Sequence, residues 1–454
     1  MTSLGGRMEA QRYGNMKIEQ KSWKLFLDKI FNYSERGSSI KTEVIGGITT
    51  FLTMAYIVFV NPAILADTGM DKSALITVTI LATAIGTLIF AFLGNAPFAL
   101  APGMGLNAFF TYSLVLGQGV SWQQALGVVF ISGMVFFILA VTGVRKYIAD
   151  AIPRELSIAS AAGIGLFLSF VGLKSMGVIV ADESTIVSLG EFTPTVLIAL
   201  FGLALMFIFE VKKVKGGILI SIVITTAISI ITGHVDLPSS IISAPPSIEP
   251  VALKLDILGA LKFSLIGPIF SFMFIDMFDS LAFLISCCKQ MGLEDEKGDI
   301  KGLPNMLYAD VTSTLIGSLL GTSTVTTFGE SAAGIAAGAR TGLASVITAL
   351  LFLVTLLFTP LLGAVPSYAA APALVMVGVF MFTSIKQVNF DDSKIAVSAF
   401  ITILLMPLTY SISTGLCFGF ISYILMHVVS KETHKLSLTL WIIGILSVIN
   451  LVLC

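Results

Sequence analysis

Three acidic residues lie inside apolar segments of this chain, where ionised side chains are costly. Glu330 follows the short polar stretch 326–329, and Asp276 and Asp279 lie within the aromatic-rich stretch 270–284. An ionisable group inside a bilayer costs roughly 2.5–3.5 kcal/mol on insertion scales, so it is first interpreted as part of a functional site. No lysine lies close to these acids in the sequence. We therefore expect a site near the membrane midplane that binds protons or a ligand with N–H donors.

The composition indicates a polytopic α-helical membrane protein. Of the 454 residues, 56% are hydrophobic and only 12% are charged, whereas soluble domains carry about 25% charged residues. The net charge of −1 argues against a nucleic-acid partner. Residues 1–43 are polar and basic and lack the short apolar core of a cleavable signal peptide. We expect them to form a cytoplasmic segment, with an amphipathic helix at 23–31 on the inner membrane surface.

Fourteen segments have the apolar character of membrane-spanning helices, which need about 20 residues each. With the N-terminus in the cytoplasm, the predicted inner segments hold 22 lysines and arginines and the outer ones hold 4, as the positive-inside rule requires. A further apolar stretch, 437–453, either spans the membrane or lies beside the bundle. The predicted spans are 44–64, 74–94, 98–117, 124–143, 155–172, 193–211, 216–232, 262–286, 306–320, 326–339, 341–361, 371–385, 395–411 and 413–429.

The cysteines and histidines do not form the spacing of a metal site. The four cysteines are Cys287, Cys288, Cys417 and Cys454, and the three histidines lie at segment ends or in loops. We expect no metal and no cofactor. Because no histidine is expected inside the bundle, a proton carrier there would have to be a carboxylate.

Two predicted spans are poor helices and occupy matching places in two halves of the chain. Residues 95–105 contain two prolines and two glycines, and residues 322–329 are β-branched and polar. Both predict extended backbone that leads into a short helix, which is tolerated at membrane depth only inside protein or beside a cavity. A constant offset of 227 residues aligns Gly103 with Glu330 and Asn107 with Gly334.

The two halves, about 44–232 and 262–429, each contain seven predicted spans, and an odd number forces the second half to insert upside down. Inverted repeats with paired interrupted helices indicate a transporter site. Two half-helices entering from opposite sides would meet at their N-termini, which carry unpaired N–H groups and partial positive charge.

Several side chains around these half-helices are candidate ligand-binding groups. Asp276 and Asp279 are three residues apart and therefore share a helix face. Asn107 has donors and an acceptor and could bind the edge of a heterocycle, or it could form an interhelical hydrogen bond. Phe98 and Phe328 could enclose a flat ring or serve as packing. Glu330 could alternatively be only a helix cap.

Three motifs resemble the adenine/guanine/hypoxanthine permeases, the AzgA-like branch of the nucleobase–cation symporter-2 family. They are Ala101-Pro-Gly-Met-Gly-Leu-Asn-Ala-Phe-Phe110, Phe278-Asp279-Ser280 and the segment from Gly321 to Gly342. The resemblance implies the fourteen-span, 7+7 inverted-repeat fold of the uracil permease, with a core domain and a gate domain. The division is 1–43 cytoplasmic segment; 44–143 core, first repeat; 144–232 gate, first repeat; 233–261 extracellular loop; 262–361 core, second repeat; 362–429 gate, second repeat; 430–454 tail with an apolar helix.

The resemblance also implies proton-coupled purine uptake across the plasma membrane by alternating access. It places the family's acid of the eighth span at Asp279, its glutamate of the tenth span at Glu330 and its asparagine of the third span at Asn107. We expect these residues, with Phe328, Gly329 and Phe98, to bind the substrate, and Asp279, Asp276 and Glu330 to carry the coupling proton. Two motifs depart from the family. The family's usual Phe-Asp-Thr-x-Gly-Thr is replaced at 278–283 by Phe-Asp-Ser-Leu-Ala-Phe, which ends at Phe283. The family's usual aromatic–aliphatic pair before the glutamate is replaced by Phe328-Gly329.

Two other functions use similar features. An anion carrier of the same fold would favour bare half-helix N-termini, and Glu330 argues against it. An intramembrane aspartyl protease also needs two buried acids, but its Tyr-Asp and Gly-x-Gly-Asp motifs are missing from the sequence. The sequence does not rank the purines, decide between proton and sodium coupling, or decide whether the chain forms the gate-domain homodimer seen in this fold.

Overall fold

The computed structural model of the chain is mostly helical and describes residues 23–142, 153–238, 240–294 and 300–453. After a helix at 23–31 come α2 (Ile40–Met54), α3 (Ile57–Ala66), α4 (Lys72–Leu93), β1 (Leu100–Pro102), α5 (Met104–Ala108), the π-helix η1 (Phe109–Gly117), α6 (Trp122–Thr142), α8 (Arg154–Ser175), β2 (Ile179–Asp182), β3 (Ile186–Leu189), α9 (Pro194–Val211), α10 (Gly217–Ile231) and α11 (Ile257–Ala260). The second half contains η2 (Phe263–Leu265), α12 (Ile266–Gln290), α13 (Leu303–Leu320), β4 (Val325–Thr327), α14 (Ser331–Ala336), α15 (Gly342–Thr355), η3 (Leu356–Phe358), α16 (Thr359–Gly363), α17 (Ser367–Phe382), η4 (Thr383–Gln387), α18 (Ser393–Leu408), α19 (Ile412–Val429), η5 (Thr433–Lys435) and α20 (Leu438–Leu453). The predictions for residues 1–22, Arg145, Lys146, Lys297 and Cys454 lie outside the described residues.

Within the described ranges, nine helical stretches are long and apolar enough to cross a membrane, and four shorter apolar helices accompany them. α2 and α3 form one of the nine, Ile40–Ala66. The chain is therefore a multi-pass membrane protein. The exact number of crossings stays a prediction, as does the membrane position of 437–453, where α20 packs against α19.

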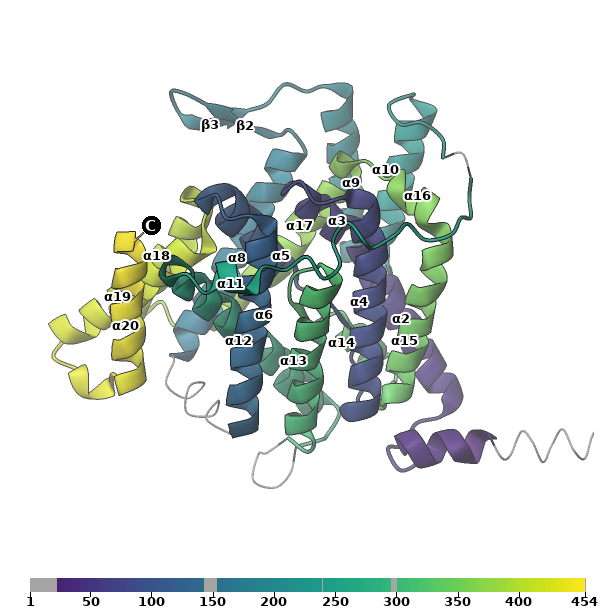
Figure 1. The fold of residues 1–454 in the computed structure, drawn as a ribbon, viewed down its shortest axis with the longest axis horizontal. Coiled ribbons are helices and arrows are strands. Elements are labelled where there is room, and N and C mark those ends of the chain that lie inside the picture. The colour runs from purple at the N-terminus through teal and green to yellow at the C-terminus, as the bar shows by residue number, and fades with distance from the viewer. Residues whose placement is uncertain (1–22, 143–152, 239, 295–299, 454) are drawn as a thin grey trace, which may run out of the picture.

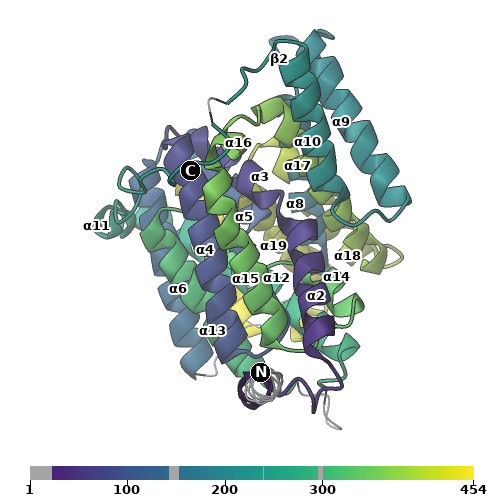
Figure 2. The same cartoon turned by 90° about the vertical axis from the view of Figure 1, so that its right-hand side faces the viewer.

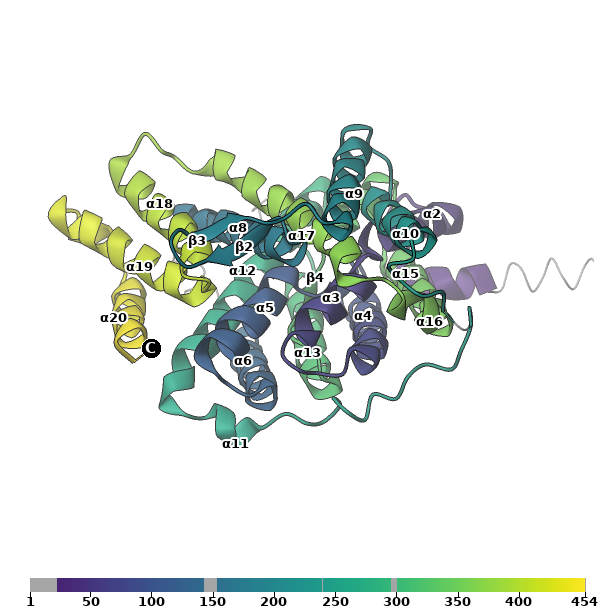
Figure 3. The ribbon, with the colours of Figure 1, turned by 90° about the horizontal axis from the view of Figure 1, so that it is seen from above.

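The helices pack in two groups. α4 packs against α13 and α15, and α2 also packs against α15, while α8 packs against α17 and α18. Figure 1 shows α4, α6, α13 and α15 standing nearly parallel, with the helix at 23–31 lying across one end and the β2–β3 hairpin at the other. Figure 2 shows α9 and α10 as a pair beside this bundle. In the view from above (Figure 3), α18, α19 and α20 lie together at the opposite side.

The predicted extended stretches are confirmed and meet at the centre of the molecule. β1 and β4 pair antiparallel, with Leu100 opposite Thr327, and Figure 3 shows β4 among the helices. The Gly103 N–H donates to the Thr324 carbonyl at 3.0 Å, which extends the pairing beyond the strands. Each strand leads directly into a short helix, α5 or α14. The sequence requires this because prolines interrupt the first stretch and β-branched residues favour the extended form in the second.

The offset of 227 residues relates positions that the structure treats alike. Gly103 and Glu330 both occupy N-cap positions. Thr87 of α4 donates to the Leu100 carbonyl of β1 at 3.2 Å, and Thr314 of α13 donates to the Val325 carbonyl of β4 at 3.0 Å. Each repeat thus fastens its own strand with an equivalent threonine.

Small residues, among them Gly46 of α2 and Gly334 of α14, allow these two helices to pack closely. A methyl group at Gly334 would overlap the Thr50 hydroxyl and the Gly46 carbonyl, so the two backbones touch at this point. Close approach through glycine is a common way for helices to associate in membranes. This contact fixes the position of the residue that precedes α14, which is Glu330.

Candidate functional site

Glu330 occupies the N-cap position of α14, but its carboxylate does not act as a cap. The side chain makes no capping hydrogen bond to the N–H groups of this helix. Its Oε1 atom instead accepts a hydrogen bond from the hydroxyl of Tyr56, at the junction of α2 and α3. The residue is partly exposed. These observations do not favour the alternative in which Glu330 is only a helix cap. One carboxylate oxygen is held by a fixed donor, and the group is accessible to a ligand.

The two predicted aspartates of α12 have different surroundings. Asp276 is 2% exposed and its Oδ2 atom accepts from the Thr314 hydroxyl at 3.2 Å. Its Oδ1 atom is buried and has no hydrogen-bond partner among the described residues. Asp279, nearly one turn further along, is partly exposed. Asp276 is therefore an interior carboxyl, whereas Asp279 is accessible.

Asp310 of α13 is a fourth intramembrane acid, and our sequence analysis did not identify it. It is fully buried and accepts hydrogen bonds from the Ser280 hydroxyl at 2.6 Å, the Thr327 N–H at 2.9 Å and the Thr327 hydroxyl at 2.8 Å. Ser280 also bonds the Thr326 hydroxyl at 2.7 Å. Asp310 therefore fixes β4 to α12 and α13. The rule that singled out Glu330, an acid within an apolar segment, would have found it.

One face of α12 points toward the start of α14. Phe283 lies one turn after Asp279, so the two side chains share a helix face. A methyl group at Gly329 would overlap the Phe283 ring, which places this ring against the backbone just before Glu330. The same face of α12 carries Asp279, and that Asp279 and Glu330 share one site stays a prediction. Phe283 stands at a position where the sequence departs from the resembling family, and our prediction gave it no role.

Asn107 is fully buried in α5 and already has protein partners. Its Oδ1 atom accepts from the Ser323 hydroxyl, and its Nδ2 atom donates to the Pro102 carbonyl at 3.4 Å. These bonds connect the half-helix of the first repeat to the strand entry of the second. The arrangement favours the structural hydrogen bond that was the alternative for this residue, and its role in substrate binding stays a prediction.

The two predicted aromatic residues lie in the interior. Phe98 is 1% exposed, and its ring meets Phe90 edge-on with centroids 5.5 Å apart. Phe328 is 6% exposed, and its N–H donates to the Ala99 carbonyl at 2.9 Å. Both residues thus extend the β1–β4 pairing by their backbones or pack beside it. The prediction that they enclose a flat ring stays a prediction.

Glu43 shows how a purely structural acid looks in this protein. It is fully buried in α2, and its carboxylate accepts from the N–H groups of Arg340 at 2.9 Å and of Thr341 and Ala344 at 3.3 Å each. An acid at a helix N-terminus is stabilised by the unpaired N–H groups and the helix dipole. Both oxygens are used in this way, unlike those of Glu330. Across the described ranges, no group of three or more metal-binding side chains is found.

Comparison with protein families gives a match over most of the chain. The model of Xan_ur_permease, described as a permease family, matches residues 41–417. A putative permease of Methanocaldococcus jannaschii is 49% identical, and the alignment covers 93% of this chain and 97% of that protein. The adenine permease AdeP of Escherichia coli is 42% identical over 95% of this chain and 97% of its own length. The guanine/hypoxanthine permease PbuG of Bacillus subtilis is 42% identical over 92% and 98%.

Among solved structures, the transmembrane domain of the cyanobacterial bicarbonate transporter BicA has the same fold. The TM-score is 0.62, and the alignment covers 83% of this chain and 96% of that chain at 18% sequence identity. At this identity the similarity concerns the fold alone. It is consistent with the predicted 7+7 inverted repeat and carries no information about the ligand.

Proposed function

We propose that this chain, which belongs to the permease family Xan_ur_permease, transports purine nucleobases across the cell membrane. As a permease it is a transporter rather than an enzyme, which removes the aspartyl protease interpretation. Relatives that are 42% identical over more than nine-tenths of the chain are named adenine permease and guanine/hypoxanthine permease. The structural observation that carries the proposal is Glu330, an accessible carboxylate held by Tyr56 at the start of a half-helix.

In this proposal, Glu330 and Asp279 accept hydrogen bonds from ring N–H or exocyclic amine groups of the purine. Carboxylates are strong acceptors, and bonds to charged groups contribute about 1.5–3 kcal/mol each. Phe328, Gly329 and Phe283 would form the apolar surroundings, since the Phe283 ring lies against Gly329. Asn107 and Phe98 would support the site from the first repeat.

We assign the coupling proton to the carboxyl groups of α12 and α14, with Asp276 as the first candidate. Its Oδ1 atom is buried and unpaired among the described residues. Burying a bare charge costs far more than burying a neutral polar group, so this position suits a protonated carboxyl. Asp279 and Glu330 are accessible and would exchange protons with the site. Proton release and purine release would then be linked.

Alternating access would come from movement of the core domain against the gate domain. We infer fourteen crossings in two inverted halves and a cytoplasmic N-terminus, with α12 and the two half-helices in the core. The substrate would move with the core because Glu330 and Asp279 both belong to it.

The anion-carrier alternative has only the shared fold in its favour. The fold neighbour BicA is a bicarbonate transporter, but an anion bound at the start of α14 would face the carboxylate of Glu330. Sulfate and bicarbonate flux into proteoliposomes would detect this activity.

The direct test is uptake of radiolabelled adenine, guanine and hypoxanthine by cells that lack purine permeases. Glu330→Gln removes the charge and keeps the shape, and we expect uptake efficiency to fall about 10- to 100-fold, as loss of one charge-assisted hydrogen bond predicts. Asp279→Asn should behave similarly. Glu183→Gln, on the exposed hairpin turn, is the matched control. Uptake by Glu330→Gln equal to that of the parent would refute its assigned role.

Coupling is tested separately in the same cells. A proton uncoupler should abolish concentrative uptake, whereas replacing sodium with potassium should leave it unchanged. The opposite result would assign the coupling to sodium.

A further inference from the structure

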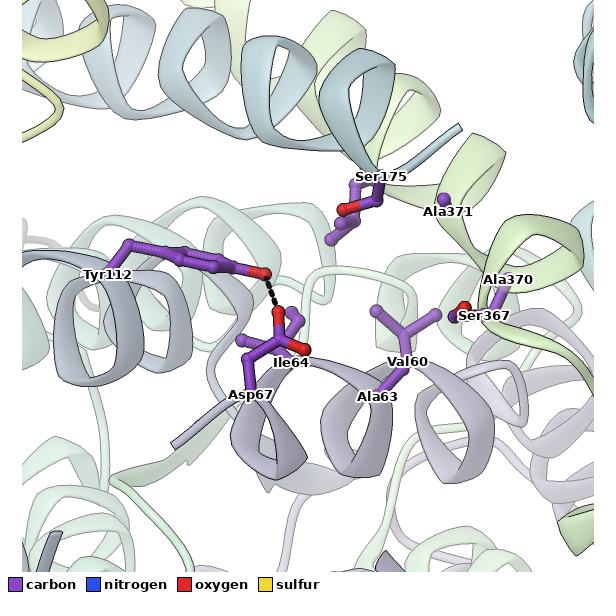
Figure 4. Close-up of a pocket in the computed structure, with 10 residues that line it drawn as sticks. Val60, Ala63, Ile64, Asp67, Tyr112, Ser175, Ser367, Ala370 and Ala371 are labelled. Carbon is purple, nitrogen blue, oxygen red and sulfur yellow. Dashed lines mark hydrogen bonds between the residues drawn. The ribbon is translucent and has the colours of Figure 1, made fainter. Parts of the chain in front are cut away.

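A cavity with a volume of about 190 Å³ has none of the acids of α12 and α14 in its lining. It is lined by the end of α3, Tyr112 of η1, the last residue of α8 and the first two turns of α17 (Figure 4). α3 and η1 belong to the predicted core domain, and α8 and α17 belong to the predicted gate domain. The hollow therefore lies on the boundary along which the two domains would move. It is near the β2–β3 hairpin, on the predicted outer side.

Helix α3 connects this cavity to the candidate site. Tyr56, which bonds Glu330, immediately precedes α3. Val60 and Asp67 line the cavity from the same helix and its C-cap. With a rise of 1.5 Å per residue, the backbones of Tyr56 and Asp67 are about 16 Å apart. Asp67 is therefore well separated from the Glu330 region, whereas Val60, at the other end of the cavity, lies only about one helical turn from Tyr56.

Asp67 places a carboxylate where the helix itself does not stabilise it. It is exposed and forms the C-cap of α3, and negative charge is disfavoured at the C-terminal end of a helix. No ion pair to Asp67 is found among the described residues. Lys174, at the end of α8, instead lies over the Tyr410 ring, 4.8 Å from its centroid. The charge of Asp67 is therefore available to a ligand that brings hydrogen-bond donors.

The polar groups of the cavity have a fixed arrangement. The Tyr112 hydroxyl donates to Asp67 Oδ2 at 2.8 Å, and Figure 4 shows this bond directed into the space below Ser175. The Tyr112 ring is held edge-on by Tyr410, with centroids 5.6 Å apart. Asp67 thus has one oxygen bonded to Tyr112 and presents the rest of its carboxylate at the mouth of the cavity.

The cavity changes from polar at its mouth to apolar at its floor. Asp67, Ser175 and Ser367 are exposed, whereas Ile64 is 2% and Leu374 is 3% exposed. Small-molecule sites combine apolar walls with a few placed polar groups in this way. One water molecule needs only about 10–15 Å³ of such volume, so this cavity has room for a small ring. Apolar walls suit the faces of a flat heterocycle, and a carboxylate suits its N–H edge.

We propose that this cavity is an outer binding site for the transported nucleobase, in which Asp67 accepts a hydrogen bond from a ring N–H group. The proposal rests on the proposed function and adds a site that the substrate occupies before it reaches Glu330. Because its walls come from both predicted domains, movement of the core would close the cavity and pass the ligand inward along α3.

The test is substrate protection of a cysteine placed at the mouth. Ser367→Cys is labelled in intact cells with a membrane-impermeant maleimide, with and without adenine, guanine or hypoxanthine. At about ten times the Kd of the outer site, labelling should slow roughly tenfold, because a bound site is free only a fraction 1/(1 + [L]/Kd) of the time. Protection should persist when Glu330→Gln is added and disappear when Asp67→Asn is added. Ser184→Cys on the hairpin should be labelled equally with and without purine.

The outcomes separate this inference from the proposed function. Purine uptake by the unmodified protein without any protection of Ser367→Cys overturns the outer site alone. Protection that disappears with Glu330→Gln also overturns it, because the cysteine would then report only the inner site. Full protection with Asp67→Asn overturns the role of that carboxylate. A well-expressed protein that neither takes up nor binds any purine overturns the proposed function itself.

Discussion

The two short segments at the centre of the molecule, β1–α5 and β4–α14, are predicted membrane crossings and are called here the first and the second crossing. They have the same backbone plan and different chemistry. Both begin as paired strands and both continue into a half-helix. The N-cap is Gly103 in the first crossing and Glu330 in the second. The polar side chain of the first half-helix, Asn107, is fully buried and bonded within the protein, whereas Glu330 is partly exposed. This difference favours our proposal that the first crossing serves as a frame and the second carries the ligand chemistry.

The neighbouring helices show the same division. The offset of 227 relates Asp310 to Thr83, and both are fully buried. Asp310 accepts three hydrogen bonds that fasten β4, whereas the Thr83 hydroxyl has no partner among the described residues. The repeat that holds the accessible carboxylate is thus also the one whose strand is fixed by an additional acid. Rigid support of this kind keeps a binding group in position.

The largest effect on stability is expected from breaking that support. Asp310→Ala leaves the Thr327 N–H without its acceptor, and each buried donor left unpaired costs about 1–3 kcal/mol. We expect a loss of about 2–4 kcal/mol in the free energy of unfolding, because two donors to Asp310 come from β4. Thermal unfolding of the purified protein in detergent measures it.

Thr83→Val is the matched change in the first repeat. It replaces an unpaired buried hydroxyl with a methyl group of the same shape, which is neutral or stabilising. Equal destabilisation by the two variants would contradict the asymmetry between the repeats.

A smaller effect is expected in the first crossing. Ser323→Ala removes the donor to Asn107 Oδ1, so the free energy of unfolding should fall by about 1 kcal/mol. If Asn107 has only a structural role, the ratio of the KM values for adenine and hypoxanthine should not change. A changed ratio in competition uptake would show that Asn107 contacts the substrate and would place ligand chemistry in both crossings.

The smallest effect is expected from a surface acid, which sets the baseline. Glu432 lies 3.1 Å from each of Lys435 and Lys394, and these lysines hold the pKa of the Glu432 carboxyl below its ordinary value. Its contribution to stability is therefore present above the ordinary glutamate pKa and is lost as the pH falls through the lowered value. Exposed pairs contribute little, so Glu432→Gln should leave the unfolding temperature at pH 7 almost unchanged. If Glu432→Gln lowered the unfolding temperature as much as Asp310→Ala, the effect of Asp310→Ala could not be attributed to the burial of its carboxylate.

The sequence by itself determined that this is a membrane protein, and it predicted the two interrupted segments 227 residues apart. It could do so because the free-energy cost of an ionisable group in the bilayer and the backbone preference of each residue are local properties. Intramembrane acids such as Glu330 stand out for the same reason. Only the tertiary structure decided which acids are accessible. Asp276 and Asp279 are indistinguishable by composition, yet contact with α13 buries the first and leaves the second partly exposed. Tyr56, Phe283 and Asp67 likewise acquire their partners from segments far away in the chain, and no local pattern encodes such contacts.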